Sequence, residues 1–222
     1  MIDPRIKYPC YKSFDDFMDV DRLRSLDQYL RIGLERHVAA QDDREFYTGP
    51  FLLDPASRDR PGSRMVYLTR SKRADDYYDL NRPETWEPAE GAREFPLLMD
   101  FIATLPFRAT GRMIIMYDDV ARPVSAHRDH VSYDLCHEFV WFRTNLQKPF
   151  YMLDPETDEK AYVTSYGAWF DTVNQFHGSD PQEGLCWSIR VDGVFDDAFR
   201  KTIPIPASNL ASTPALWACT SG

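Results

Sequence analysis

The chain has 222 residues, 43% of them hydrophobic and 14% aromatic, and it carries a formal net charge of −9 at pH 7. That length suits one domain with a substantial core, and the hydrophobic content excludes a disordered chain. The acidic balance argues against a nucleic-acid backbone or an anionic membrane surface as the main partner.

An amphipathic helix is the first element that the sequence predicts. Ser13 and Asp16 resemble a capping box, and the helix would run over about residues 14–38. The leucines that would form its buried face recur at helical spacing, and they are Leu23, Leu26, Leu30 and Leu34.

Two short strands and a second helix follow. Aromatic and β-branched residues predict strands at Phe46–Leu53 and Met65–Thr69, and a turn-rich stretch with two prolines separates them. A helix over about residues 92–105 is predicted because its apolar residues share one face. These apolar residues are Leu98, Phe101, Ile102 and Leu105.

From Arg112 onwards the pattern changes to short runs rich in aromatic and β-branched residues, with turn signals every few residues. Strands at this density predict a mostly β protein with flanking helices and an antiparallel jelly roll, because a parallel sheet needs long helical crossovers. We expect one domain over residues 1–222, with a mixed helical support at 1–110, a core at 111–195 and a tail at 196–222. The expected core strands are Arg112–Asp118, Val124–Tyr133, Glu138–Asn145, Pro149–Leu153, Lys160–Ser165, Ala168–Asp171, Gln175–Gly178 and Leu185–Val191.

The sequence His127-Arg128-Asp129, with His177 fifty residues after the first histidine, is the most informative pattern in the chain. In a strand, residues i and i+2 point to the same side, so His127 and Asp129 can reach one metal while Arg128 faces away. A jelly roll can bring His177 to the same place from a later strand. Two imidazoles and one carboxylate hold iron(II) on one face and leave the other face open. The pattern His-x-Asp alone also arises by chance, and a strand histidine is often a hydrogen-bonded core residue.

Arg190 lies thirteen residues after His177, on the next predicted strand. Its guanidinium offers a fixed fork for an anionic co-substrate. Three protein ligands leave room on iron for a 2-oxo acid, which takes two positions, and for dioxygen. Together these residues suggest an oxygenase.

The stretches AHRDH, FRTN, YGAWFDTVNQFHGS and WSIRVDG resemble those of iron(II)- and 2-oxoglutarate-dependent oxygenases. Within that superfamily the chain most resembles the aspartyl/asparaginyl β-hydroxylase group, including its small bacterial members that hydroxylate free proline. The resemblance covers roughly residues 95–195 and implies a double-stranded β-helix, which is a cupin-like jelly roll. It also implies that His127, Asp129 and His177 are the catalytic iron ligands and that Arg190 anchors 2-oxoglutarate.

The match to this group has one departure. Proline-hydroxylating relatives carry an Arg-x-His pair on the strand before the TN motif, where this chain has His137 and Phe139. His137 could keep part of that role in binding the co-substrate, and a strand-edge histidine is an equally good interpretation. Ser188 shares a predicted strand face with Arg190, and Tyr117 ends the first core strand, so both are candidates for the same carboxylate. A serine bonded to the backbone and a packed tyrosine are the alternatives.

The substrate expected from the sequence is small, polar and amino-acid-like. The N-terminal helices and the tail are long enough to close a jelly-roll mouth over one small ligand. His137 or Arg143 is expected to contact it. Arg128 and Arg143 are candidates for binding an acidic group, although solvated surface charges are the simpler interpretation of both.

The cysteines and the N-terminal residues favour a cytoplasmic protein. The first residues are polar and no long apolar segment follows, so we expect neither a signal peptide nor a membrane span. The cysteines show no C-x-x-C spacing, which fits buried thiols in a reducing compartment. They are Cys10, Cys136, Cys186 and Cys219.

The expected activity is hydroxylation of an unactivated C–H bond with release of succinate and carbon dioxide. Iron(II), 2-oxoglutarate and dioxygen are the expected cofactor and co-substrates, with ascorbate as a possible reductant. We expect a small-molecule substrate, no nucleic acid and no membrane as partners, and the oligomeric state is left open. Three alternatives remain: a hydroxylase of a protein or peptide side chain, a cupin-type metalloenzyme without 2-oxoglutarate, and a non-catalytic jelly-roll binding module.

Overall fold

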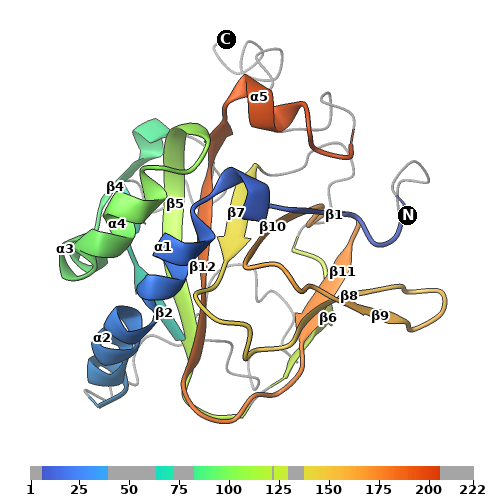
Figure 1. Ribbon diagram of the computed structural model, residues 1–222, viewed down its shortest axis with the longest axis horizontal. Coiled ribbons are helices and arrows are strands. Elements are labelled where there is room, and N and C mark those ends of the chain that lie inside the picture. The colour runs from blue at the N-terminus through green and yellow to red at the C-terminus, as the bar shows by residue number, and fades with distance from the viewer. Residues whose placement is uncertain (1–6, 40–63, 73–82, 122, 130–137, 206–222) are drawn as a thin grey trace.

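The core of the protein is a pair of facing antiparallel β-sheets (Figure 1). The computed structural model describes residues 7–39, 64–72, 83–121, 123–129 and 138–205. The large sheet has the strand order β1-β10-β7-β12-β5-β2, and the small sheet has the order β6-β11-β8-β9. From β5 to β12 the chain crosses between the two sheets at every step except from β8 to β9, which pair within the small sheet, and this jelly-roll order confirms the predicted fold class. Their bounds are β5 Phe107–Asp118, β6 Val124–His127, β7 Phe139–Phe142, β8 Phe150–Leu153, β9 Lys160–Tyr162, β10 Gly167–Phe170, β11 Phe176–Ser179 and β12 Cys186–Phe195.

Each of the eight predicted core strands corresponds to one of these strands. The longest ladder joins β5 and β12, from the pair Asp118 and Cys186 to the pair Phe107 and Phe195. The core therefore begins before residue 111, where the sequence placed its start. Two short strands, β1 (Tyr11–Ser13) and β2 (Arg64–Tyr67), extend the edges of the large sheet.

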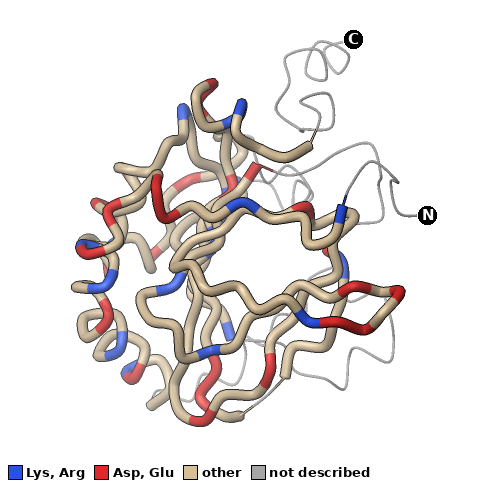
Figure 2. The backbone as a smooth tube through the Cα atoms, turned by 45° about the vertical axis from the view of Figure 1, so that its right-hand side comes forward, with Lys and Arg blue, Asp and Glu red and all other residues tan. Residues whose placement is uncertain are grey.

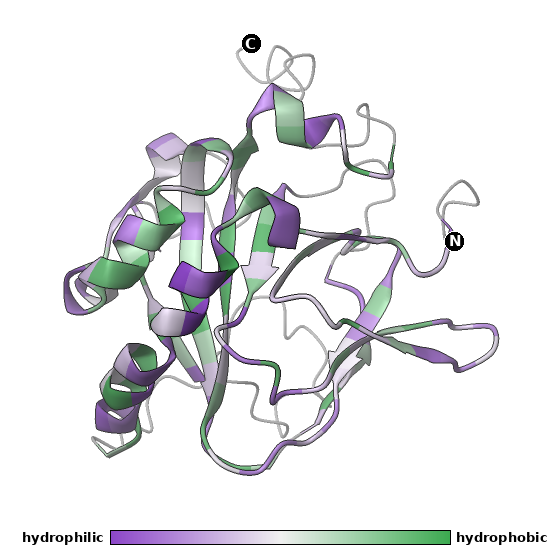
Figure 3. Cartoon of the chain, viewed as in Figure 1, coloured by the Kyte–Doolittle hydropathy of each residue, from purple (hydrophilic) through white to green (hydrophobic). Residues whose placement is uncertain are grey.

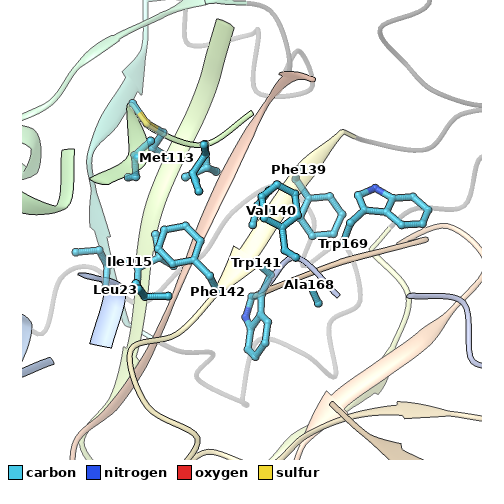
Figure 4. Packing of buried hydrophobic residues seen from close by; sticks show 14 of the residues in the cluster. Leu23, Met113, Ile115, Phe139, Val140, Trp141, Phe142, Ala168 and Trp169 are labelled. Atoms are coloured by element: carbon cyan, nitrogen blue, oxygen red, sulfur yellow. The ribbon is translucent and has the colours of Figure 1, made fainter. Parts of the chain in front are cut away.

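The two faces of the large sheet have different roles. Alternate residues of β12 point to opposite sides, and residues paired across strands share a side. Ile189 pairs with Ile115 of β5 and with Phe142 of β7, and these three residues are fully buried. Figure 4 shows Ile115 and Phe142 within the hydrophobic core. The ring of Phe142 lies 5.6 Å from that of Phe101, so this side of the sheet faces the helices and the opposite side faces the small sheet.

Four helices cover the helix-facing side of the large sheet, as Figure 1 shows beside β5 and β2. They are α1 (Val20–Ser25), α2 (Asp27–Ala39), α3 (Glu90–Glu94) and α4 (Pro96–Ile102). Leu23 of α1 and Leu30 and Leu34 of α2 are fully buried. Hydrophobic positions also follow β7 and β12 under the helices (Figure 3), which is the pattern expected when amphipathic elements bury one face.

The predicted helix over residues 14–38 is wrong at its start and in its continuity. Residues Asp15–Phe17 form a 3-10 turn, and α1 begins after Asp19, whose carboxylate accepts a 2.9 Å hydrogen bond from the Arg22 N–H. Ser13 Oγ accepts from the Asp15 N–H at 3.3 Å. Ser13 therefore supports a turn, and Asp19 caps the helix.

The predicted helix over residues 92–105 is divided into α3 and α4 by Pro96. Proline has no N–H to donate and its ring clashes with the preceding turn, so the chain starts a new helix with proline at its first position. The predicted inward face is confirmed, because Leu98, Phe101, Ile102 and Leu105 are all buried.

The start of the predicted tail packs against the core. Helix α5 (Asp197–Arg200) is held by Arg200, whose Nε donates to Oε1 of the fully buried Glu138 at 2.6 Å. Ile203 and Ile205 are also buried. The remainder of the tail and the predicted strand Phe46–Leu53 lie outside the described residues.

The remaining described elements are small. Strands β3 (Thr69–Ser71) and β4 (Trp86–Pro88) form a separate two-stranded sheet. Basic and acidic positions are interspersed along α1 and α2 (Figure 2). Among the helices that the structure describes, none is long and apolar enough to cross a membrane.

Candidate metal site

The structure brings His127, Asp129 and His177 together. His127 ends β6 and is the register partner of His177 on the neighbouring strand β11, so both imidazoles point to the same side of the small sheet. Asp129 follows β6 by two residues. One donor atom from each of the three side chains lies within 4.8 Å of the other two, which is a spacing that can hold one metal ion.

Backbone carbonyls fix the tautomer of both histidines. Nδ1 of His127 lies 2.8 Å from the Ser125 carbonyl oxygen, and Nδ1 of His177 lies 3.1 Å from the Gln175 carbonyl oxygen. A carbonyl oxygen only accepts, so each Nδ1 carries the hydrogen. In the neutral ring Nε2 then carries the lone pair, as a metal ligand requires.

Both Nε2 atoms face a single carboxylate oxygen. Oδ1 of Asp129 lies 3.4 Å from Nε2 of His127 and 3.2 Å from Nε2 of His177. Lone pairs that converge in this way repel one another unless a proton or a cation lies among them. The side chain of His127 is 45% exposed and that of His177 is 6% exposed, so the group is open to solvent on the β6 side.

The environment of Asp129 keeps its carboxyl group ionised. In the metal-free site a proton can take the place of the metal on each Nε2. Burial alone would then raise the pKa of Asp129, but the charges of His177 and Arg190 and hydrogen bonds from both histidines hold it well below its usual range. In return, although desolvation alone would lower the pKa of His127, its hydrogen bond and charge interaction with Asp129 raise it. An ionised carboxylate beside two imidazoles is the donor set that suits iron(II) or another divalent transition metal.

A compact turn after β10 holds Asp129 and His177 in place through backbone hydrogen bonds. The Asp129 N–H donates to the Thr172 carbonyl at 3.0 Å, and the same turn supplies the Gln175 carbonyl that bonds His177. Asp171, which is fully buried, accepts hydrogen bonds from the backbone of Val173 at 3.0 Å and from the side chain of Asn174 at 2.8 Å. One turn thus links the two sides of the triad.

Arg190 reaches the triad from the large sheet. Its Nη1 donates to Oδ2 of Asp129 at 2.7 Å, and its Nε donates to Oδ1 of Asp192 at 3.0 Å. Its Cζ lies 4.1 Å from the centre of the Phe139 ring. Its Nη2 is buried and lies 3.0 Å from Asp192 Oδ1. This contact lacks hydrogen-bond geometry, and Nη2 has no acceptor among the described residues.

The unsatisfied Nη2 fits an anionic ligand beside the metal. Nη1 and Nε of Arg190 are already bonded to Asp129 and Asp192, and Nη2 makes only an ion contact, so one N–H donor remains for a carboxylate ligand. The residues present therefore fit a divalent metal at the triad, and a dicarboxylic co-substrate such as 2-oxoglutarate at Arg190.

The other sequence candidates fall in different places. Ser188 lies on the same face of β12 as Arg190 and is buried, as predicted. Tyr117 pairs with Trp187, so it lies on the helix-facing side, where its ring is 6.3 Å from that of His37. The structure does not bring Tyr117 to Arg190, because the two residues point to opposite faces of one sheet. His137 lies outside the described residues.

Arg128 and Arg143, the two candidates for binding an acidic group, lie in different environments. Arg128 turns away from the triad, as expected, and its Nη1 donates to the Val173 carbonyl at 3.3 Å. Arg143 is only 2% exposed, so its interpretation as a solvated surface charge is wrong. It donates to the carbonyl oxygens of Lys148 at 2.6 Å and of Ser165 at 3.2 Å, and its buried Nε has no partner in the described part of the chain. Burial lowers the pKa of Arg143 to about 10.

Arg143 lines a hollow of about 210 Å³ together with Leu146, Pro149, Phe150, Tyr162, Val163 and Thr164. The ring of Phe150 separates this hollow from His177, with 5.9 Å between the two ring centres. Trp141 stacks on Phe150 at 4.3 Å, and the Arg143 guanidinium lies 5.1 Å from the Trp141 ring. The hollow therefore lies one aromatic ring away from the triad.

Sequence reasoning missed Asp192 and Arg112. Arg112 of β5 donates from Nε to Oδ2 of Asp192 at 2.9 Å, and both side chains are almost wholly buried. The predicted strand Leu185–Val191 ended one residue before Asp192, whereas β12 continues to Phe195 and so places Ser188, Arg190 and Asp192 on one face.

Comparisons with known proteins inform the fold of the chain. No family model and no curated protein matches its sequence. Among solved structures, it is similar to a prolyl hydroxylase from Trichoplax adhaerens in complex with a hypoxia inducible factor oxygen degradation domain peptide fragment. The identity is 10%, 89% of each chain is covered and the TM-score is 0.50.

Two other solved structures give lower TM-scores. A Pseudomonas putida prolyl-4-hydroxylase is 13% identical, with 82% of this chain and 90% of that chain covered and a TM-score of 0.42. AviO1 from Streptomyces viridochromogenes Tue57 is 16% identical, with 87% and 93% covered and a TM-score of 0.43. Together with the strand order, the likeness at a TM-score of 0.50 shows that this chain has the double-stranded β-helix fold expected from its sequence.

Proposed function

We propose that this protein is an iron(II)- and 2-oxoglutarate-dependent dioxygenase that hydroxylates an unactivated C–H bond. The observation that carries the proposal is the convergence of one donor atom each from His127, Asp129 and His177, with the buried Arg190 beside them.

Each residue of the site has a definite task in this reaction. His127, Asp129 and His177 would hold the metal through Nε2, Oδ1 and Nε2, and leave the exposed side of the site open to ligands. Arg190 would bind the distal carboxylate of 2-oxoglutarate through Nη2, the nitrogen that makes no hydrogen bond in the described part of the chain. Phe170, whose ring lies 4.7 Å from that of His177, would help to exclude water. The bound metal and co-substrates supply the oxidation, which converts dioxygen, 2-oxoglutarate and C–H into C–OH, succinate and carbon dioxide.

The substrate that we propose is small, polar and amino-acid-like. The proposal rests on the length of 222 residues and the net charge of −9, which favour a small molecule over a large polyanion. The hollow beside Phe150 is separated from His177 by that ring, so a ligand there would reach the triad only if Phe150 moved. The peptide held by the Trichoplax prolyl hydroxylase makes a peptide side chain the alternative to be tested.

Succinate formation is the direct test. The purified protein is incubated with iron(II), ascorbate and 2-oxoglutarate, with a panel of free amino acids and derivatives in one arm and proline-containing peptides in the other. We expect substrate-dependent succinate from the small-molecule arm and none from His177→Ala. Succinate from peptides alone would overturn the proposed substrate class. Stoichiometric metal without 2-oxoglutarate turnover in either arm would favour a cupin-type metalloenzyme, and absence of stoichiometric metal would favour a binding module.

A further inference from the structure

Asp192 is the most deeply buried member of the polar group around Arg190. It lies two residues beyond Arg190 on the same face of β12, and none of its surface is exposed. Its Oδ1 accepts from Arg190 Nε at 3.0 Å and its Oδ2 accepts from Arg112 Nε at 2.9 Å. A carboxylate buried to this degree requires paired cations, and here it connects two arginines from adjacent strands.

The connection continues to the metal site. Arg190 Nη1 donates to Oδ2 of Asp129 at 2.7 Å, while Oδ1 of the same carboxylate faces the two histidines. A guanidinium is planar, so the bond from Nε to Asp192 and the contact of Cζ with the Phe139 ring together determine the direction of Nη1. The plane of Arg190 in turn determines which way the Asp129 carboxylate faces.

We propose that Asp192 is a positioning residue for the metal site. With Arg112 as its counter-ion, it sets the plane of Arg190, and Arg190 then turns the Asp129 carboxylate so that Oδ1 faces both histidines. The inference rests on the part of the proposed function that places a divalent metal at the triad, and it requires neither 2-oxoglutarate nor turnover.

The charges of the network dictate how it can be tested. Among the described contacts, Asp129 and Asp192 pair with Arg190 and Arg112, so removal of Asp192 alone takes a carboxylate away from two buried cations and is expected to destabilise the fold. The double variant Arg112→Met/Asp192→Asn removes one charge of each sign and leaves Arg190 and Asp129 in place. Because the deleted pair is neutral, a loss of metal affinity in this variant reports orientation and not net charge.

The chain offers a matched control pair. Glu138 is fully buried and binds Arg200, with 2.6 Å between Oε1 and Nε. This pair is also a buried carboxylate with an arginine, and its described hydrogen bonds join the residue before β7 to α5 and to the end of β12. The variant Glu138→Gln/Arg200→Met therefore reports what loss of a buried ion pair does to metal binding in general.

Cobalt(II) binding to the metal-free protein tests the proposal. Cobalt(II) accepts the same nitrogen and oxygen ligands, its affinity can be measured by chelator competition, and its visible absorption reports ligand geometry. We expect Arg112→Met/Asp192→Asn to fold, as judged by circular dichroism, and to bind cobalt(II) about 10- to 100-fold more weakly with an altered spectrum. The control pair variant should keep the affinity and spectrum of the parent.

A folded Arg112→Met/Asp192→Asn variant with the affinity and spectrum of the parent would overturn the proposal. If that variant does not fold, Asp192→Glu, which keeps the charge but displaces the carboxylate from Arg190 by one methylene group, is measured instead, and parent-like cobalt(II) affinity and spectrum there contradict the proposal. A parent protein that binds cobalt(II) but never turns over 2-oxoglutarate would overturn the proposed function and leave this test intact. A parent that binds no cobalt(II) would overturn both.

Discussion

Arg190 donates a 2.7 Å hydrogen bond from Nη1 to Oδ2 of Asp129, while the other oxygen of that carboxylate faces the histidines. Asp129 thus has one oxygen for a metal and one for a buried cation. A carboxylate held from its outer oxygen loses rotational freedom before any metal arrives, which lowers the entropic cost of binding. The residue expected to anchor the co-substrate is therefore also part of the support of the metal ligand.

His177→Ala should abolish metal-dependent spectroscopy. It removes the more buried imidazole of the triad, which leaves one histidine and one carboxylate to hold the ion. We expect the anaerobic visible charge-transfer band of the iron–2-oxoglutarate complex in the parent and none in the variant. His37→Ala is the control, because His37 pairs with Glu94 at 2.9 Å on the helical side of the protein. A full-intensity band in His177→Ala would show that His177 is not a ligand.

Arg190→Lys should raise the KM for 2-oxoglutarate. Lysine keeps the charge but cannot bond Asp192, Asp129 and a co-substrate carboxylate from one fixed plane. Loss of a buried charge-assisted contact costs about 2–5 kcal/mol, so an increase in KM of about 30-fold or more is expected at saturating iron(II). Arg108→Lys, at a half-exposed arginine of β5, is the control. An unchanged KM for 2-oxoglutarate in Arg190→Ala would show that another residue binds the distal carboxylate, and the buried Arg143 is then the alternative to test.

The strands could be predicted from sequence because their signals are local. Alternating aromatic and β-branched residues between turn residues identified each core strand, and the two-residue period placed His127 and Asp129 on one side. The helix boundaries were harder to predict from sequence because each depends on a single residue. Pro96 ends α3 and begins α4. Asp19, and not Ser13, is the residue whose side chain caps α1.

Register explains what the sequence could not supply at the site. Tyr117 was expected near Arg190, yet its partner across the ladder is Trp187, which faces the helices. The face of a residue on one strand is known relative to another strand only when their pairing is known, and a shift by one residue reverses it. Asp192 lies one residue beyond the predicted strand Leu185–Val191, and its partner Arg112 is 80 positions earlier and becomes its neighbour only through the β5–β12 ladder.

Gly178→Ala should displace β6 and weaken metal binding. A Cβ at this position would lie 2.5 Å from the Val124 carbonyl oxygen and 2.7 Å from the Tyr151 hydroxyl. The tyrosine can move, but Val124 belongs to the strand that carries His127, so relief of the clash separates the two histidines. We expect a loss of about 1–3 kcal/mol in stability and weaker cobalt(II) binding.

The neighbouring substitution Ser179→Ala is the matched control for Gly178→Ala. Its buried Oγ has no hydrogen-bond partner among the described residues, so deletion of the hydroxyl should leave both unfolding and cobalt(II) affinity close to those of the parent. Parent-like cobalt(II) affinity in Gly178→Ala would show that β6 tolerates the shift without moving His127.

Cys10 should make the stability of the protein depend on pH in the alkaline range. It is 4% exposed, and burial, followed by the charge of Asp171, raises the pKa of its thiol from 9.0 to about 12. The raised folded-state pKa means that its contribution is fully present below pH 9 and is lost as the pH rises towards 12, because only the unfolded chain ionises easily in that interval. Between pH 8 and pH 10 the parent should therefore lose about 1 kcal/mol more unfolding free energy than Cys10→Ala. Urea unfolding of both proteins at the two pH values measures this difference, and equal losses would show that the thiol ionises as readily in the folded protein as in the unfolded chain.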